Sequence, residues 1–238
     1  MPARSAPGAD RRAPVVLAFD TAASACSVAV SCGVALLAHE RREMRHGHAE
    51  ALLPMIDRVV AAAGLAPDDI AVVAVSVGPG GFTGIRAGLA AAQGLALAGG
   101  ARLVGVTSLA TVAALVPNAG TNLLVALDSR REDFYVQLFD ADRLPLGEAA
   151  TVLPEALGRF VAAANGAAPL RVAGDAAEQA AATLSACDIV HGSAPDARGV
   201  LAAALGCLDS NETPARALYL RPADVSFPKT RRRIDGAS

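Results

Sequence analysis

The sequence predicts an α/β fold made of two copies of one unit, in which three strands are followed by a helix, a strand and a helix. Two apolar segments lead to this prediction, because each is typical of a buried strand and each ends on Asp: residues 14–20 (PVVLAFD) and 122–128 (NLLVALD). A similar order of strand-like and helix-like segments follows both of them. An internal duplication explains this order, with a boundary in the turn-rich residues 117–121 (PNAGT).

Hydrophobic periodicity gives the elements of the first half. Short apolar and β-branched runs predict strands, whereas apolar residues spaced three or four apart predict helices. The predicted strands lie at 14–20, 26–31, 34–43, 70–77 and 102–106, and the predicted helices at 49–64, 84–98 and 107–116. The strand at 70–77 is continuously apolar, as expected for a strand that is covered on both faces.

The second half repeats this order with shorter segments. Its predicted strands lie at 122–128, 133–139, 143–152, 170–173 and 189–190, and its predicted helices at 154–164, 175–185 and 197–208. The pattern resembles two ribonuclease-H-like subdomains, at residues 15–117 and 118–228, as found in the actin, Hsp70 and sugar-kinase (ASKHA) superfamily. Outside them we expect a loose tail at 1–14 and a basic tail at 229–238.

The composition excludes several classes of protein. The chain has 238 residues, of which 53% are hydrophobic and 3% aromatic, and its formal net charge is −2. This apolar fraction excludes a disordered chain, and no apolar run approaches the roughly 18 residues of a membrane span. Four cysteines without a CxxC pair favour free thiols in the cytoplasm. The near-neutral charge argues against a nucleic-acid binder that works alone.

Asp20 ends the first strand, where the ASKHA superfamily places an Asp that handles metal and phosphate. The next four residues, 21–24 (TAAS), contain neither the Gly nor the Lys that a phosphate-binding hairpin would use. The favoured interpretation is an Asx-turn in which Asp20 caps its own hairpin. The alternative is a retained nucleotide contact.

A glycine-rich loop at residues 78–84 (GPGGFTG) lies between a predicted strand and a predicted helix, where phosphate loops occur. It fits neither standard template, because Ile-Arg follows its last Gly instead of Lys-Ser/Thr, and Thr83 replaces the third Gly of the dinucleotide fingerprint. The favoured interpretation is a tight turn with Thr83 as the helix N-cap. Under the alternative, Gly80, Gly81 and Thr83 contact a nucleotide.

No catalytic or metal-binding set can be assembled from the sequence. Ser76 is one residue away from a nucleophile-elbow pattern, and its helix begins too late for the strained turn. His46 and His48 are two residues apart, whereas two ligands on one helical face are four apart. We therefore expect no catalytic residue, no bound metal and no cofactor held by this chain alone.

The two helices of the first half predict a protein–protein interface. The helix at 49–64 has a second apolar row, and the helix at 84–98 has small residues at a four-residue spacing that allows close helix approach. One explanation is packing inside the subunit, and the other is a helical dimer face. The residues of the predicted face are Ala49, Leu53, Val60, Gly84, Gly88 and Ala92.

The stretch GPGGFTGIRAGLAAAQGLA, at residues 78–96, resembles the signature of the TsaB (YeaZ) family. Other segments resemble that family in the same order: AFDTAASACSVAV, HAEALLPMID, VGVTSLA, ALDSRREDFY and LYLRPADVSFPK. The resemblance implies the duplicated ASKHA fold. It also implies a non-catalytic role in adding threonylcarbamoyl to the adenosine next to the anticodon of ANN-reading tRNAs.

The resemblance further implies partners. In the TsaB family the transfer is catalysed by a paralogue, TsaD, which holds a metal through His-x-x-x-His, and an ATPase, TsaE, joins the pair. The pairing uses the first two helices, so we expect a homodimer when the chain is alone. We expect tRNA to bind through the complex, and any ATP or ADP to lie at the complex interface. The alternatives are a stand-alone ATP-dependent kinase or ATPase and a glycoprotease-like metallopeptidase, and the failed phosphate-loop template and the His spacing argue against them.

Overall fold

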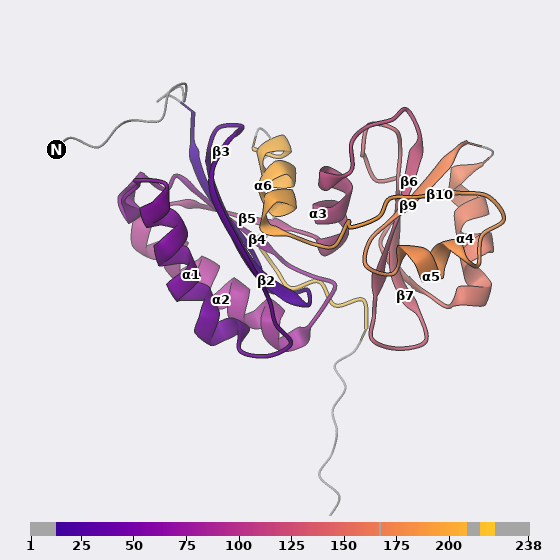
Figure 1. Cartoon of the computed structure of the whole chain (residues 1–238), viewed down its shortest axis with the longest axis horizontal. Coiled ribbons are helices and arrows are strands. Elements are labelled where there is room, and N and C mark those ends of the chain that lie inside the picture. The colour runs from indigo at the N-terminus through magenta and orange to yellow at the C-terminus, as the bar shows by residue number, and fades with distance from the viewer. Residues whose placement is uncertain (1–12, 167, 209–214, 222–238) are drawn as a thin grey trace, which may run out of the picture.

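Two five-stranded mixed sheets, one in each half of the chain, form the framework of the molecule (Figure 1). The structure is a computed structural model that describes residues 13–166, 168–208 and 215–221. The first sheet contains β1 (Val15–Asp20), β2 (Ala25–Cys32), β3 (Ala35–Glu43), β4 (Val72–Ser76) and β5 (Arg102–Val106). The second contains β6 (Asn122–Asp128), β7 (Phe134–Phe139), β8 (Ala150–Val152), β9 (Leu170–Ala173) and β10 (Asp188–Ile189).

The strand orders confirm the duplicated α/β fold. The first sheet has the order β3-β2-β1-β4-β5 and the second has the order β8-β7-β6-β9-β10. In both sheets the first three strands of the half pair antiparallel, and the fourth strand lies parallel to the first. The two halves therefore share one topology, and the two carboxylate-ended strands, β1 and β6, are both central.

Helices cover both faces of each sheet. Their bounds are α1 (His48–Ala62), α2 (Phe82–Gly99), α3 (Ser108–Leu115), α4 (Pro154–Asn165), α5 (Ala177–Ala181) and α6 (Ala197–Gly206), with a 3-10 turn at Pro67–Asp69. The apolar sides of α1 and α2 pack on the outer face of the first sheet, and those of α4 and α5 on the outer face of the second. Helices α6 and α3 lie between the sheets, so the molecule has five layers (Figure 1).

The two inner helices are exchanged between the halves. Helix α3 follows β5, and its buried residues Leu109 and Val112 pack on the second sheet against Leu123 and Val125. Helix α6 follows the second sheet, but it packs on the first sheet. The sequence analysis expected the segment 197–208 to complete the second half. This helix does follow the second half in the sequence, but it packs on the sheet of the first half.

Three local predictions are wrong. The strand predicted at 143–152 begins only at Ala150, because the carboxylate of Asp140 accepts the backbone N–H of Leu144 in a turn. The helix predicted at 175–185 is limited to α5. Thr83 is not an N-cap, since α2 begins at Phe82 and its N-cap is Gly81. The predicted boundary at 117–118 stays a prediction. Residues 222–238, and with them the basic tail, lie outside the described residues, as do residues 1–12.

Candidate functional site: the cleft between the halves

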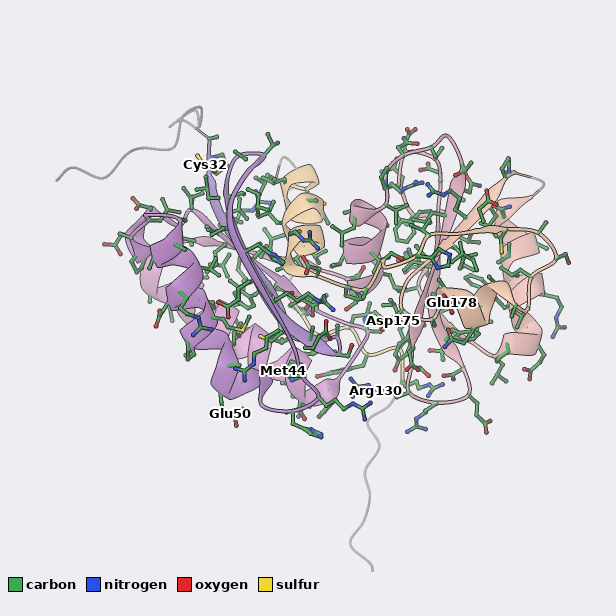
Figure 2. The ribbon with its side chains drawn as sticks, in the orientation of Figure 1. Cys32, Met44, Glu50, Arg130, Asp175 and Glu178 are labelled. Atoms are coloured by element: carbon green, nitrogen blue, oxygen red, sulfur yellow. The ribbon has the colours of Figure 1, made fainter. Side chains whose placement is uncertain are left out.

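The ends of the two central strands meet at a small cleft between the halves. Its volume is about 120 Å³, and it is lined from both sides, by Gly80, Gly81 and Ser108 from the first half and by Asp128 and Asp175 from the second. Figure 2 shows Asp175 in the second half, facing the gap between the sheets. Sites for drug-sized ligands usually enclose about 300–1,000 Å³, so this cleft is small for a nucleotide.

Asp20 forms the Asx-turn that the sequence favours. Its Oδ1 accepts the backbone N–H of Ala22 at 2.6 Å and the hydroxyl of Ser76 at 2.8 Å. The side chain is completely buried, and its Oδ2 has no hydrogen-bond partner among the described residues. Burial raises the pKa of Asp20 above its ordinary value, although the hydrogen bonds from Ala22 and Ser76 act in the opposite direction. The carboxylate exposes no surface to a ligand in the cleft.

Asp128 repeats this arrangement in the second half. Its Oδ1 accepts the backbone N–H of Arg130 at 2.6 Å, and its own N–H donates to the carboxylate of Asp175 at 2.9 Å. Desolvation raises the pKa of Asp175, and the nearby Asp128 charge acts in the same direction. Sequence reasoning missed Asp175. The signal that locates it is the Gly-Asp pair after β9, the strand parallel to β6, where Gly174 has a φ of +116°.

The glycine-rich loop packs on the turn that follows Asp20. The N–H of Gly81 donates to the carbonyl oxygen of Ala22 at 2.8 Å, and the hydroxyl of Thr21 donates to the carbonyl oxygen of Gly84 at 2.7 Å. A Cβ atom at Gly84 would overlap the carbonyl oxygen of Thr21. The glycines of this loop therefore allow two backbone segments to touch. The Gly81 N–H, which could otherwise bind a phosphate, already donates to Ala22.

The other residues of the predicted nucleotide contact lie around the loop without converging. Gly80 is exposed at the cleft, whereas Thr83 lines a neighbouring hollow. Ser76 is buried and donates to Asp20, which removes it as a nucleophile. Among the described residues no group of three or more His, Cys, Asp or Glu side chains could hold a metal ion.

The predicted partner face is wrong for four of its six residues. Val60 belongs to the core between α1 and the first sheet, and Ala92 is also completely buried. A Cβ atom at Gly88 would overlap the hydroxyl oxygen of Thr21, so this side of α2 packs inside the subunit. Gly84 is buried on the same side of α2. The remaining two residues, Ala49 and Leu53, are exposed.

The outer side of α1 and α2 carries a different apolar surface. Leu97 is 86% exposed and Leu53 is 51% exposed. Ala90 and Gly94 are exposed on α2 at the helical spacing that leads to Leu97. We call Ala49, Leu53, Ala90, Gly94 and Leu97 the outer helix face. Of this face, the sequence analysis had named only Ala49 and Leu53.

Comparisons with known proteins agree over most of the chain. Residues 40–187, more than half of the chain, match the family model described as TsaD, tRNA N6-adenosine threonylcarbamoyltransferase. An uncharacterized protein of Mycobacterium tuberculosis is 34% identical over 215 residues, which cover 88% of this chain and 93% of that protein. YeaZ from Pseudomonas aeruginosa superimposes with a TM-score of 0.76 at 27% identity, over 87% of this chain and all of that structure.

A protein of Escherichia coli K12 named tRNA threonylcarbamoyladenosine biosynthesis protein TsaB is 38% identical over 129 residues, which cover 53% of this chain and 55% of that protein. The chain belongs to the TsaB (YeaZ) family. The match spans about half the length of the first curated TsaB relatives, at 55% and 51%. A dehydratase activator from Clostridium difficile, with a TM-score of 0.52 and 13% identity, shares the fold alone.

The recognition of the TsaB family from the glycine-rich stretch is thereby confirmed, and so is the ASKHA fold class. Among the described residues, none of the helices has both the length and the apolar character that a membrane span requires.

Proposed function

We propose that this TsaB-family chain is a cytoplasmic, non-catalytic subunit of the complex that adds threonylcarbamoyl to the adenosine next to the anticodon of ANN-reading tRNAs. It works with a TsaD-like catalytic paralogue and a TsaE-like ATPase, and tRNA binds through the complex. The named relatives support the pathway, since the protein of Escherichia coli carries threonylcarbamoyladenosine biosynthesis in its name.

The small cleft and the buried Asp20 are the observations that support a non-catalytic role. Asp20 is buried, the N–H of Gly81 is bonded to Ala22, and the cavity of about 120 Å³ leaves little room for a nucleotide. ATP or ADP would then be held at the interface with a partner and not by this chain alone. The stand-alone kinase or ATPase is disfavoured for the same reason.

The outer helix face supports pairing with a partner that presents two helices of its own. Leu53 and Leu97 expose apolar surface, and the small residues Ala90 and Gly94 on α2 would let another helix approach closely. We infer that this face forms a four-helix bundle with TsaD. Alone, the chain would bury the same face in a two-fold homodimer.

Reconstitution tests the proposed function. The chain, a TsaD-like protein, a TsaE-like protein, ATP, threonine, bicarbonate and the enzyme that makes the threonylcarbamoyl donor are mixed with unmodified tRNA, and the modified nucleoside is measured by mass spectrometry. We expect modification to require this chain, and we expect the chain alone to show negligible ATP turnover. Modification of equal rate without the chain, or rapid ATP hydrolysis by the chain alone, contradicts the proposal.

Leu97→Glu tests the pairing surface. An unpaired charge buried in an apolar helix contact is costly, so we expect binding to TsaD, measured by calorimetry, to be lost while the melting temperature stays near that of the wild type. Leu144→Glu is the matched control, because Leu144 is 62% exposed in the other half of the molecule. Equal binding by the two variants contradicts the assignment.

A further inference from the structure

Two hollows lie on either side of Phe82, outside the central cleft. One has a volume of about 260 Å³ and is lined by Phe82, Tyr135 and Tyr219, together with backbone of the glycine-rich loop. The other has a volume of about 440 Å³ and is lined by Phe82, Arg45 and Arg130, among others. We call them the aromatic hollow and the basic hollow. Because Phe82 lines both, they form one continuous surface beside the cleft.

The aromatic hollow contains a stacking surface, which we define as the partly exposed rings of Phe82 and Tyr219 with the Arg86 guanidinium on one face of Phe82. The rings of Phe82 and Tyr219 lie 5.1 Å apart at 35°, and the Arg86 guanidinium lies 3.7 Å from the centre of the Phe82 ring. Phe82 is 38% exposed and Tyr219 is 41% exposed, in a chain whose aromatic content is only 3%. Exposed aromatic rings beside arginine are the surface on which proteins stack the bases of single-stranded RNA.

The segment 215–221 holds Tyr219 in this place. The N–H of Leu218 donates to the carbonyl oxygen of Val77 at 2.8 Å, which fixes the segment beside the end of β4. Arg221 pairs with Asp133 of the second half, and Arg86 donates to the Tyr219 hydroxyl at 3.2 Å. The segment thus contacts both halves, so the stacking surface is built by the fold and is not a single exposed ring.

The basic hollow can receive phosphate. Arg45, His46 and Arg130 are exposed around it, and Glu50 is its one acidic lining residue. Figure 2 shows Arg130 and Glu50 in the lower part of the molecule, with Arg130 at the foot of the gap between the halves, and both residues line this hollow. Helices α1 and α2 both begin at this hollow without a side-chain cap. Uncapped N–H groups of the first turn favour anions.

We propose that these two hollows form a binding site for single-stranded RNA, with one base on Phe82 and Tyr219 and the adjoining phosphates in the basic hollow. The proposal deepens the proposed function and rests on it, because it supplies the RNA contact of this subunit. A formal net charge of −2 keeps such binding weak and salt-dependent for the chain alone.

Fluorescence anisotropy of the full chain with two labelled probes tests the site. One probe is a short single-stranded RNA and the other is an abasic RNA of the same length, which keeps the phosphates and lacks the bases. We expect Tyr219→Ala to weaken binding of the RNA by about five- to a hundredfold and to leave the abasic strand nearly unaffected. Tyr219→Phe keeps the ring and retains most of the affinity.

Arg45→Ala tests the phosphate side and is expected to weaken both probes and to reduce the slope of affinity against salt. Arg159→Ala on α4 is the matched control, because Arg159 is exposed and lines neither hollow. Circular dichroism checks that every variant is folded. Equal binding of the two probes by the wild type, or unchanged RNA binding by Tyr219→Ala and Arg45→Ala, overturns the RNA site.

The measurement is independent of the proposed function, because it needs neither TsaD nor TsaE. Absent RNA binding together with active reconstitution overturns the RNA site alone. RNA binding as expected, with modification that does not require the chain, overturns the subunit proposal and supports the site as an RNA contact of another kind.

Discussion

Asp20 is the buried carboxyl group on which the turn after β1 depends. Its Oδ1 accepts hydrogen bonds from Ala22 and Ser76, while its Oδ2 is buried with no partner in the part of the chain that the structure describes. Because burial raises the pKa of Asp20, the folded protein holds this proton more tightly than the unfolded chain. The free energy of unfolding contributed by this group therefore falls as the pH rises from the unfolded pKa through the folded pKa.

Asp20→Asn tests this linkage. The amide oxygen keeps the hydrogen bonds from the turn, and the ionisation is removed. The stability of the variant should therefore decline less than that of the wild type as the pH rises from the unfolded pKa through the folded pKa of Asp20. Urea unfolding at several pH values measures the difference. Parallel pH profiles for the two proteins contradict the linkage.

The helix α2 is placed by its glycines more than by its apolar residues. Gly84 and Gly88 face the turn after Asp20, where Thr21 approaches so closely that a Cβ atom would overlap it. Gly94 lies on the exposed side of the same helix, with nothing within 4 Å of an added Cβ. One helix therefore contains glycines that the packing requires and a glycine that only lowers helix propensity.

Gly84→Ala and Gly94→Ala separate these two kinds of glycine. We expect Gly84→Ala to lower the free energy of unfolding by about 2 kcal/mol or more, because the Thr21 carbonyl is backbone and cannot move away cheaply. Gly94→Ala should raise it by up to about 1 kcal/mol through helix propensity. Thermal and urea unfolding give both values. Similar stability changes in the two variants count against the close approach.

At the scale of the whole molecule, the exchanged helices α3 and α6 join the two halves. Asp196, the N-cap of α6, accepts the backbone N–H of Arg198 at 2.9 Å, and its carboxylate lies 3.1 Å from His39 and 3.5 Å from Arg41 on β3. Burial acts to raise the pKa of Asp196, but the hydrogen bonds from Arg198 and the nearby His39 hold it below the ordinary value. One carboxylate thus anchors α6 to the first sheet.

Asp196→Ala should lower the free energy of unfolding at neutral pH by about 1–3 kcal/mol, since it removes a helix cap and the carboxylate that His39 and Arg198 contact, whereas Arg41 keeps its ion pair with Glu43. Because the folded pKa of Asp196 is lowered, its contribution is present above the unfolded pKa and is lost as the pH falls through the folded value. The free energy of unfolding of the variant should therefore fall less than that of the wild type as the pH is lowered. Asp188→Ala, at an exposed position on β10, is the control in urea unfolding. An equal loss in both variants contradicts the anchoring role.

The local elements of this chain follow from the sequence because they depend on neighbours. Alternation and apolar runs predict most of the strands, the Asp that ends β1 predicts its Asx-turn, and the glycine-rich stretch identifies the TsaB family. The shortened β8 and α5 are exceptions, because turn bonds that involve Asp140 and Ala180 compete with the longer elements. The duplication could be predicted for the same reason, since both halves show the same order of local strand and helix patterns.

Long-range contacts decided which faces of the helices are buried and which distant segments meet. Small residues at a four-residue spacing indicate only that another backbone comes close, and the tertiary structure shows that this backbone is the chain's own turn at Thr21. The face of α1 and α2 that remains open, the exchange of α3 and α6, and the meeting of Phe82 with Tyr219 across 137 positions of the sequence all depend on where distant segments pack. The sequence by itself determined which segments fold and how each is patterned. Only the tertiary structure decided which of those faces are buried. Burial depends on which distant segment packs against a face, and the periodicity of a segment does not show this.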